Sequence, residues 1–150
     1  MNIHHVDNLV KQLFIYADNK QWELLEIIFA DNCVLETQLL TGKPYLKVTP
    51  TEGVQLFKEF LSGFDCTHHQ VGNMITKLKG NKAHVFSYAT ATYYIKDCEQ
   101  NVWTVVGTYE FDVIEVEKIL KIERIAFNFK YQDGNLKLRP LAMTRSTASI

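Results

Sequence analysis

The chain has 150 residues, of which 47% are hydrophobic and 12% aromatic, so it suits one compact domain that buries about two thirds of its unfolded surface. Sixteen Lys and Arg residues face 17 Asp and Glu residues, which gives a net charge of -1. Because no basic run is present that could follow a track of phosphates, nucleic acid is excluded as an expected partner.

The N-terminal part of the chain predicts two helices joined by a polar turn. Apolar residues recur at helical spacing from Val6 to Ala17, and the run stops at Asp18-Asn19-Lys20. A second amphipathic pattern begins near Gln21 and ends at Ala30-Asp31-Asn32. The two helices are expected to form a hairpin, after which Asp31 is a turn residue rather than a base.

A short strand and a third helix are predicted next. Cys33 to Leu39 has a strand-like core, and the stretch after it holds Gly42 and Pro44, which cannot continue a regular element. Thr49-Pro50-Thr51-Glu52 then supplies an N-cap threonine, a proline at the first helical position and a glutamate at the capping-box position. The helix that begins here is expected to stop near Gly63.

From Thr67 onward, β-branched and aromatic residues occur in long runs that predict strands. The runs are His68 to Leu78, Ala83 to Ile95, Val102 to Val116 and Ile119 to Tyr131. Their short connections force antiparallel neighbours, so the sheet is expected to be a meander. Helices followed by such a sheet predict an α+β fold with the three N-terminal helices on one face.

The chain is expected to form a single domain over residues 1–150, with a core from about 5 to 135. The last strand ends at Asp133-Gly134-Asn135, and the tail 136–150, rich in Ser and Thr after Pro140, is predicted to be loosely held. No window reaches the ~18 apolar residues that would span a bilayer, so no membrane contact is expected.

The cysteine and histidine residues predict neither a disulfide nor a metal site. Cys33, Cys66 and Cys98 are odd in number and widely spaced, which is typical of reduced thiols in a cytoplasmic protein. A cytoplasmic location is therefore expected. His68 and His69 are neighbours on a predicted strand, so they face opposite sides of the sheet and cannot chelate one ion.

The first of the long strands carries the candidate site. Its side chains alternate, so His69 and Asn73 share one face. Counting from the turns places His69 opposite Thr92 and Asn73 opposite Tyr88. The same counting assembles one face from all four strands, comprising His69, Asn73, Tyr88, Thr90, Thr92, Tyr109, Phe111 and Phe127. Apolar walls with a few polar groups are typical of small-molecule pockets, so a small apolar ligand is expected there.

His69 has two interpretations. In one, it is a buried neutral imidazole that hydrogen-bonds a neighbour such as Thr92. In the other, it is a general acid or base in the pocket, and Asp18 holds one tautomer of its ring. Asp18 could instead cap the second helix. Asn73 could contact a ligand or make a local bond, and the inward tyrosines could donate to an oxyanion or simply pack.

The opposite face of the sheet is predicted to be too apolar to remain in water. Its residues are expected to include Val85, Ala89, Ala91, Tyr93, Val106 and Ile114. A homodimer is the simplest way to cover such a face, because one repeated patch can satisfy itself by two-fold symmetry.

Several segments resemble the SnoaL-like branch of the nuclear transport factor 2-like superfamily. They are the stretch from Tyr16 to Leu25, with an Asp four residues before a Trp, then Phe29-Ala30-Asp31, the strand opening from Thr67 to Asn73, and the closing segment from Phe129 to Gly134. The resemblance covers roughly residues 5 to 135. It implies a curved sheet wrapped round the helices into a cone-shaped, cystatin-like roll, often dimeric through the outer sheet face.

Within this branch, the local pattern comes closest to the scytalone dehydratase-like members. An Asp at the end of the first helix and a His at the opening of this strand are active-site residues there, and they match Asp18 and His69. The other polar positions of the dehydratase are not kept, since this chain has Ala17, Thr37, Thr90, Gly107 and Tyr109 in those places. Gly107, without a side chain, is expected to leave open volume beside His69. The dehydratase reaction itself is not implied.

Two functions agree with these observations. The first is a small-molecule-binding protein that acts as a cofactor-independent isomerase, dehydratase or cyclase by moving a proton on a small apolar or aromatic carbonyl compound. His69 would be the acid or base, and a carrier with the same pocket would differ only in lacking turnover. The second is a non-catalytic assembly module, which resembles the small subunits of ring-hydroxylating dioxygenases and meets another protein through the sheet face.

Overall fold

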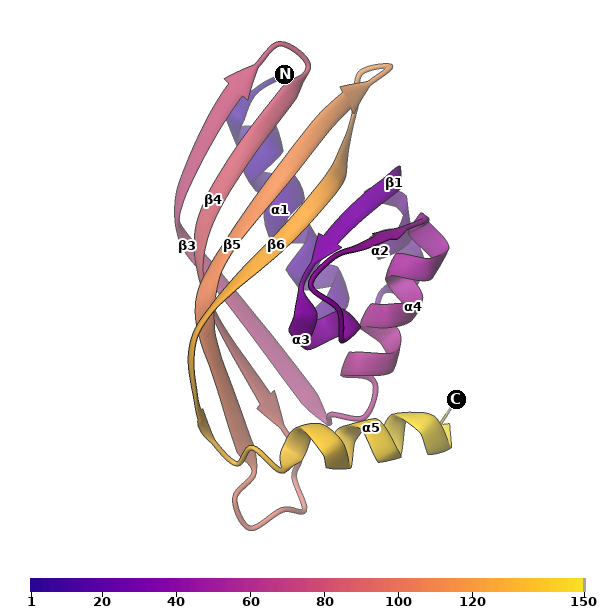
Figure 1. Ribbon diagram of the computed structural model, residues 1–150, viewed down its shortest axis with the longest axis vertical. Coiled ribbons are helices and arrows are strands. Elements are labelled where there is room, and N and C mark those ends of the chain that lie inside the picture. Colours follow the sequence, from indigo (N-terminus) through magenta and orange to yellow (C-terminus); the bar gives the residue numbers. More distant parts are fainter. Residues whose placement is uncertain (150) are drawn as a thin grey trace.

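A computed structural model, which describes residues 1–149, shows an α+β fold built on one six-stranded sheet in the order β2-β1-β6-β5-β4-β3. The strands are β1 (Phe29–Glu36), β2 (Leu46–Val48), β3 (Cys66–Lys79), β4 (Lys82–Tyr94), β5 (Val102–Val116) and β6 (Ile119–Gly134). The helices are α1 (Ile3–Asp18), α2 (Trp22–Ile27), α3 (Gln38–Thr41), α4 (Pro50–Leu61) and α5 (Leu138–Ser149). Figure 1 shows β3 to β6 as a long curved sheet that wraps into the expected cone.

The sheet is mixed rather than wholly antiparallel. The long strands β3 to β6 pair antiparallel in chain order, as predicted. Strand β1 joins the edge of β6 in parallel, with Val34 beside Arg124 and Leu35 beside Ile125. The antiparallel expectation rested on short connections, whereas β1 and β6 are far apart in the chain, and a long connection permits a parallel pair.

The helices close the inner face of the cone. Helix α1 packs against β3 through an apolar stripe of Val6, Leu9, Val10, Leu13, Phe14 and Ala17. Helix α4 has the predicted capping box, in which the Thr49 hydroxyl accepts the backbone N–H of Glu52 at 3.2 Å and the Glu52 carboxylate accepts that of Thr49 at 3.0 Å. Helix α2 ends at Ile27, earlier than expected, because Phe29 already pairs with Ile122 in the sheet.

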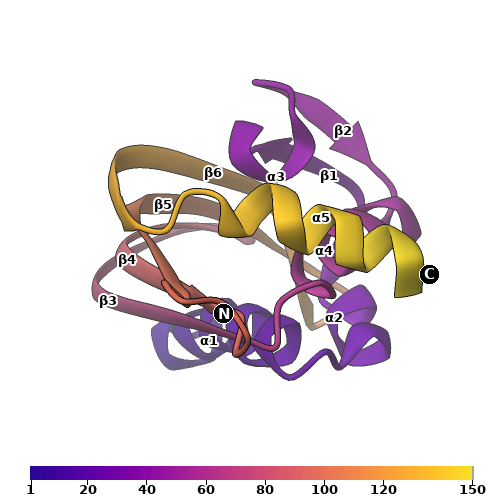
Figure 2. The same ribbon diagram turned by 90° about the horizontal axis from the view of Figure 1, so that it is seen from below.

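The C-terminal tail is not loosely held, which corrects the prediction for residues 136–149; Ile150 lies outside the described residues. The tail forms α5, which crosses the end of the cone beside α4 (Figures 1 and 2). Leu138 and Ala142 are fully buried, and Arg145 pairs with Asp65 at 2.7 Å. Few apolar residues of this segment face the core, so its periodicity is too weak to predict a helix.

A β-bulge in β3 changes the register on which the predicted site depended. Near the turn, Lys79 pairs with Lys82 and Ile75 with Phe86, as counting from the turn requires. Two residues of β3 then oppose one of β4, and Asn73 adopts a φ of 49°. Beyond this bulge every partner shifts by one residue. His69 consequently pairs with Ala91 rather than with Thr92.

Because of this shift, the face of β4 that lies beside His69 is the opposite of the predicted one. Ala89, Ala91 and Tyr93, which were expected outside, are buried on the inner face, and so is Val85. The outward placement of these residues was therefore wrong, because a one-residue slip moves every side chain to the other face. Val106 and Ile114 lie on the outer face as predicted, since they pair with Thr90 and Lys82.

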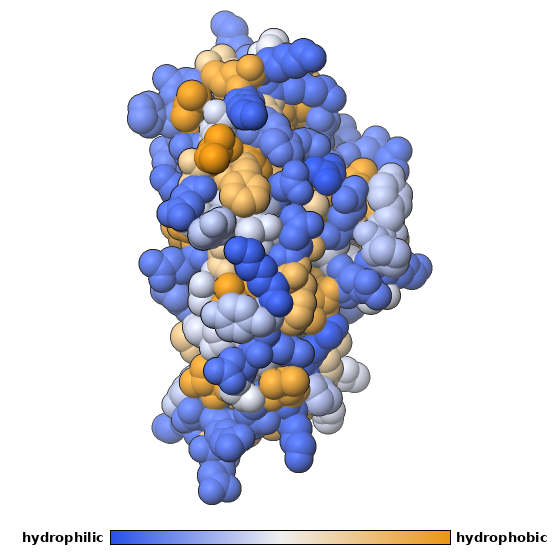
Figure 3. Space-filling model, turned by 60° about the vertical axis from the view of Figure 1, so that its left-hand side comes forward, coloured by the Kyte–Doolittle hydropathy of each residue, from blue (hydrophilic) through white to orange (hydrophobic). Residues whose placement is uncertain are grey.

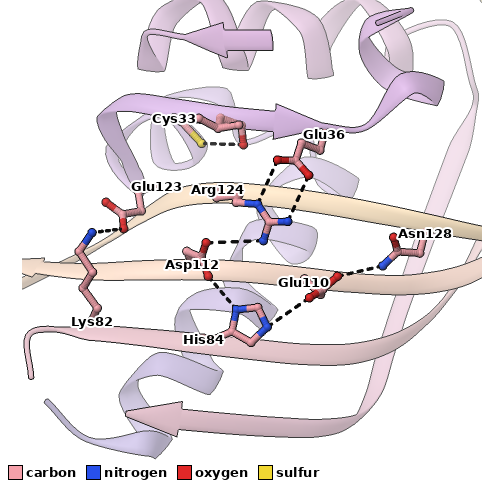
Figure 4. A network of polar contacts seen from close by, with 10 residues as sticks. Cys33, Glu36, Lys82, His84, Glu110, Asp112, Glu123, Arg124 and Asn128 are labelled. Carbon is pink, nitrogen blue, oxygen red and sulfur yellow. Dashed lines mark hydrogen bonds and ion pairs between the residues drawn. The ribbon is translucent and has the colours of Figure 1, made fainter. Parts of the chain in front are cut away.

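The outer face of the sheet is chemically mixed. His84, Asp112 and Arg124 form a row across β4, β5 and β6, in which Nδ1 of His84 lies 2.7 Å from Asp112 and Arg124 binds Glu36 at 3.1 Å (Figure 4). Figure 3, which brings the β3 and β4 side forward, shows apolar side chains as separate patches between hydrophilic ones.

Candidate functional site

An apolar pocket lies inside the cone, between α1, α4 and the inner face of the sheet. It has about 480 Å³ of space free of protein atoms, including its open mouth, and the cavity at its centre measures about 40 Å³. Its walls are Leu13, Phe14, Thr37, Leu39, Leu40, Phe57, Phe60, Leu61, His69, Tyr93, Tyr109, Ile125 and Phe127. The central cavity has room for a few waters, so a larger ligand requires the side chains at the mouth to move.

His69 lines this pocket and forms a largely buried pair with Asp18. Asp18 is the last residue of α1, and Oδ1 of its carboxylate lies 2.7 Å from Nδ1 of His69. The other oxygen, Oδ2, accepts the backbone N–H of His69 at 2.7 Å, while Oδ1 also accepts the hydroxyl of Thr67 at 2.9 Å. Asp18 does not cap α2, whose N-cap is Gln21. The end of α1 is thereby fixed to the beginning of β3.

These contacts assign one tautomer to His69. A carboxylate only accepts hydrogen bonds, so Nδ1 carries the proton that faces Asp18. Nε2 is then the unprotonated nitrogen of the ring, and it lies 3.3 Å from the hydroxyl of Tyr93. The side chains of His69 and Asp18 are 8% and 14% exposed, so their mutual interaction is little screened by water. An imidazole held in this way presents a defined proton acceptor.

Aromatic rings fix the orientation of the imidazole. Phe14 stacks on it with centroids 5.3 Å apart and an interplanar angle of 22°, and Tyr93 meets it edge-on. Burial raises the pKa of the Tyr93 and Tyr109 hydroxyls, and the negative charge of Asp18 raises both further. Both hydroxyls therefore keep their protons and act as hydrogen-bond donors.

Thr37 has a buried hydroxyl without a hydrogen-bond partner among residues 1–149. The residue follows β1 and precedes α3, where a threonine usually caps the helix, yet its side chain makes no capping bond. Thr37 is one of the residues that line the pocket. A buried hydroxyl without a partner costs free energy, which a bound polar atom would recover. In the sequence, Thr37 stood out only as a position at which the polar residue of the dehydratase is not kept.

The structure brings together some of the predicted site residues and separates others. His69, Tyr109 and Phe127 line the pocket, and Asp18 contacts His69. Tyr88, Thr90 and Thr92 lie on the opposite face of the sheet, and Tyr88 is 47% exposed. The bulge in β3 pairs His69 with Ala91, so the neighbours of Ala91 in β4 point away from the pocket. Asn73 is exposed at the bulge itself. The prediction that these residues share a face with His69 is wrong.

Two features of the pocket were missed or misjudged. Tyr93, which contacts Nε2 of His69, was assigned to the outer face. The Gly72-Asn73 pair inside a strand is a signal typical of a bulge and could have revealed the shift. Gly107 does not leave open volume, because a Cβ there would lie 2.4 Å from Asn128 O and 2.5 Å from the Phe127 ring. The ring of Phe127 fills that space.

Other chemically active side chains lie apart from the pocket. Within residues 1–149, no three His, Cys, Asp or Glu side chains gather closely enough to hold a metal ion. Burial raises the pKa of the Cys33 thiol to about 12, and the charge of Glu123 adds to this shift. Cys33 is therefore a neutral core residue. No helix of the described chain is both long and apolar enough to cross a membrane.

Comparison with solved structures confirms the fold. A protein from Kribbella flavida is 18% identical, with a TM-score of 0.82 and 90% of this chain and 94% of that chain covered. A Novosphingobium aromaticivorans protein provisionally named scytalone dehydratase is 17% identical (TM-score 0.70, 87% and 85% covered). A hexachlorocyclohexane dehydrochlorinase from Novosphingobium barchaimii is 14% identical (TM-score 0.74, 87% and 88% covered).

Sequence comparison points to the same group of proteins. No curated protein is similar enough in sequence to count as a relative. The model of the SnoaL-like domain matches residues 2–126, which is most of the chain. The segments that resembled this branch lie within or near that range, and the curved sheet has the geometry expected of the nuclear transport factor 2-like superfamily. The chain therefore belongs to the SnoaL-like domain family.

Proposed function

We propose that this protein binds a compact apolar or aromatic carbonyl compound and moves a proton on the carbon next to its carbonyl group. The observation that carries the proposal is the Asp18–His69 pair, with its 2.7 Å contact, in an otherwise apolar pocket. Such a proton transfer is common to isomerases, dehydratases and cyclases, and the protein would carry it out with its own side chains.

The pocket can assign a role to each polar group. Nε2 of His69 takes the proton, and the electron pair of the broken C–H bond moves toward the carbonyl oxygen to form an enolate. The Asp18 carboxylate stabilises the imidazolium that results. The hydroxyls of Tyr109 and Thr37 can donate hydrogen bonds to the developing negative charge. The proton then returns to another carbon in an isomerisation, or to a leaving hydroxide in a dehydration.

The structural neighbours support this class of reaction. Two of them are named for the loss of water or of hydrogen chloride. Eliminations of this kind remove a proton from carbon, which is the step proposed for His69. Their sequence identity to this chain is 17% and 14%, so the likeness supports the type of step and does not identify the substrate.

Proton exchange tests the proposal without the natural substrate. Cyclohexanone, acetophenone and 1-tetralone are incubated with the protein in D₂O, and the loss of the proton signal next to the carbonyl is followed by NMR. We expect exchange of at least one ketone above the rate in buffer. If all three exchange at the buffer rate and none binds by calorimetry, the proposal is wrong and a non-catalytic assembly role becomes the better interpretation.

Thr37→Val tests whether the unpartnered hydroxyl serves a ligand. Valine has nearly the same shape and removes only the polar atom, so the melting temperature should stay the same or rise. The affinity for the ketone should fall about fivefold, as expected for the loss of one hydrogen bond. Thr90→Val on the outer face is the matched control and should change neither quantity. Unchanged ketone affinity in Thr37→Val would remove this residue from the site.

We also propose that two copies pair through the outer sheet face and that the protein works in the cytoplasm. The side chains that support pairing are Ile75, Tyr88 and Tyr131, which are 57%, 47% and 56% exposed; Ile75 and Tyr88 pair with Phe86 and Gly72, and Tyr131 with Val106. The free thiols of Cys33, Cys66 and Cys98 support a reducing compartment. Light scattering gives the mass in solution, and a monomer would contradict the pairing.

A further inference from the structure

A second hollow adjoins the pocket on the side of α5. Its walls are Gln38, Leu39, Phe127, Phe129 and Arg139. Leu39 and Phe127 also line the pocket that contains His69, so these two side chains stand between the hollows. Phe129 is 54% exposed beside them. A ligand that displaces Leu39 or Phe127 would therefore reach from His69 to the surface under α5.

Arg139 is the only charged residue of this second hollow as the structure describes it. Its Nη2 donates to the carbonyl oxygen of Leu39 at 2.5 Å, and its guanidinium lies over the ring of Phe60 with a carbon-to-centroid distance of 5.5 Å. Both contacted residues are walls of the His69 pocket. These contacts hold the half-buried cation beside the ligand space.

The positive charge of Arg139 has no carboxylate partner in the described part of the chain, whereas Arg145 on the same helix pairs with Asp65 at 2.7 Å. A guanidinium has several N–H donors in a planar fork, and the single bond to Leu39 leaves most of them free. The charge also acts inside the pocket, because it lowers the pKa of Tyr93 against the larger raising effect of burial.

The geometry points to a carboxylate on the ligand: we infer that the substrate is a keto acid whose carboxylate binds Arg139 while its carbonyl group lies at His69. The inference rests on the proposed function and names the class of its substrate. Arginine and carboxylate match as a bidentate pair, and the partly buried location strengthens the attraction. Arg139 is a specificity residue in this arrangement, because it contacts the ligand away from the reacting atoms.

A pair of probes that differ by one carboxylate tests the inference. Acetophenone and 4-acetylbenzoate are titrated into the full chain by calorimetry, and the same titrations are repeated with Arg139→Gln. We expect the wild-type protein to bind 4-acetylbenzoate about tenfold more tightly. Arg139→Gln should abolish this preference and leave the affinity for acetophenone within about twofold, which also shows that the variant is folded. Lys137→Gln, which removes the same charge just before α5, should keep the preference.

Salt dependence of the wild-type protein supplies a measurement that needs no variant. Between 50 and 500 mM NaCl, the affinity for 4-acetylbenzoate should fall while that for acetophenone stays constant. If the wild-type protein binds both probes equally, or if the preference survives in Arg139→Gln, the inference is wrong while the proposed function stands. If neither probe binds the wild-type protein, the inference is wrong, and the exchange of the other ketones decides the proposed function separately.

Discussion

His69→Ala is expected to slow the protein-catalysed exchange of ketone protons by about 10²-fold or more, because general base catalysis commonly contributes 10²- to 10⁴-fold. The variant keeps the apolar walls, so the ketone should still bind. His68→Ala is the matched control: His68 is the neighbouring residue, but it is exposed on the other face of β3, and its loss should leave exchange unchanged. An unaltered exchange rate in His69→Ala would contradict the proposed base.

Asp18→Asn separates orientation from basicity in the same assay. The amide can still accept a hydrogen bond but carries no charge to stabilise the imidazolium, so exchange should fall less than in His69→Ala, by about tenfold or more. Asp18 also binds Thr67 and the backbone of β3, so the melting temperature must be recorded. A fall in melting temperature with full exchange activity would show that Asp18 is structural only.

The pH dependence of the exchange rate tests the proposed roles of the buried tyrosines without a substitution. The proposed step needs a neutral imidazole at His69, because only the neutral ring accepts a proton. The pKa of Tyr93 and that of Tyr109 are raised by burial, so their hydroxyls remain donors at alkaline pH. The profile should therefore reach a plateau without falling through pH 10, whereas a loss near pH 10 would indicate ordinary exposed tyrosines.

Gly63→Ala is expected to be the most destabilising small substitution in the chain. A Cβ at this position would lie 1.8 Å from the carbonyl oxygen of Ala142, which belongs to the backbone of α5 and cannot rotate away. The free energy of unfolding should fall by about 2 kcal/mol, and the melting temperature by about 6 °C. Gly72→Ala is the control, because nothing lies within 4 Å of its Cβ.

Limited proteolysis of Gly63→Ala shows whether the loss of stability is confined to α5. If α5 is displaced from Gly63, trypsin should cleave the chain after Arg145. In the wild-type protein, the ion pair of Arg145 with Asp65 helps to hold α5 in place. Arg139 precedes a proline and is a poor trypsin site. A melting temperature equal to that of Gly72→Ala would mean that α4 and α5 separate at little cost.

Much of the fold can be read from local patterns. The capping box at Thr49 to Glu52, the long β runs and the end of α1 at Asp18 are local features, because each depends on residues within one or two turns. Gly63 illustrates the limit. It looked like a helix stop, yet its importance lies in the close approach of α5, a contact between residues 79 positions apart.

The candidate site was predictable in part. Family resemblance selected Asp18 and His69, and strand alternation allowed only one of His68 and His69 to face inward. Counting residues from the turns gave the wrong walls for β4, because one extra residue at Asn73 shifts the pairing of β3 with β4 by one position. The roles proposed for Thr37 and Arg139 depend on the tertiary structure, since only the neighbours in the described chain show that the hydroxyl has no hydrogen-bond partner and the cation no carboxylate.

The sequence by itself therefore determined the α+β class, the family and an aspartate-histidine pair, because helical periodicity, strand alternation and short motifs act over a few residues. The tertiary structure alone decided which side of β4 faces the ligand, that β1 pairs in parallel with β6, and that α5 closes the end of the cone and carries Arg139 to it. These features depend on a local bulge and on contacts between distant segments, whose free energies no single stretch of sequence contains.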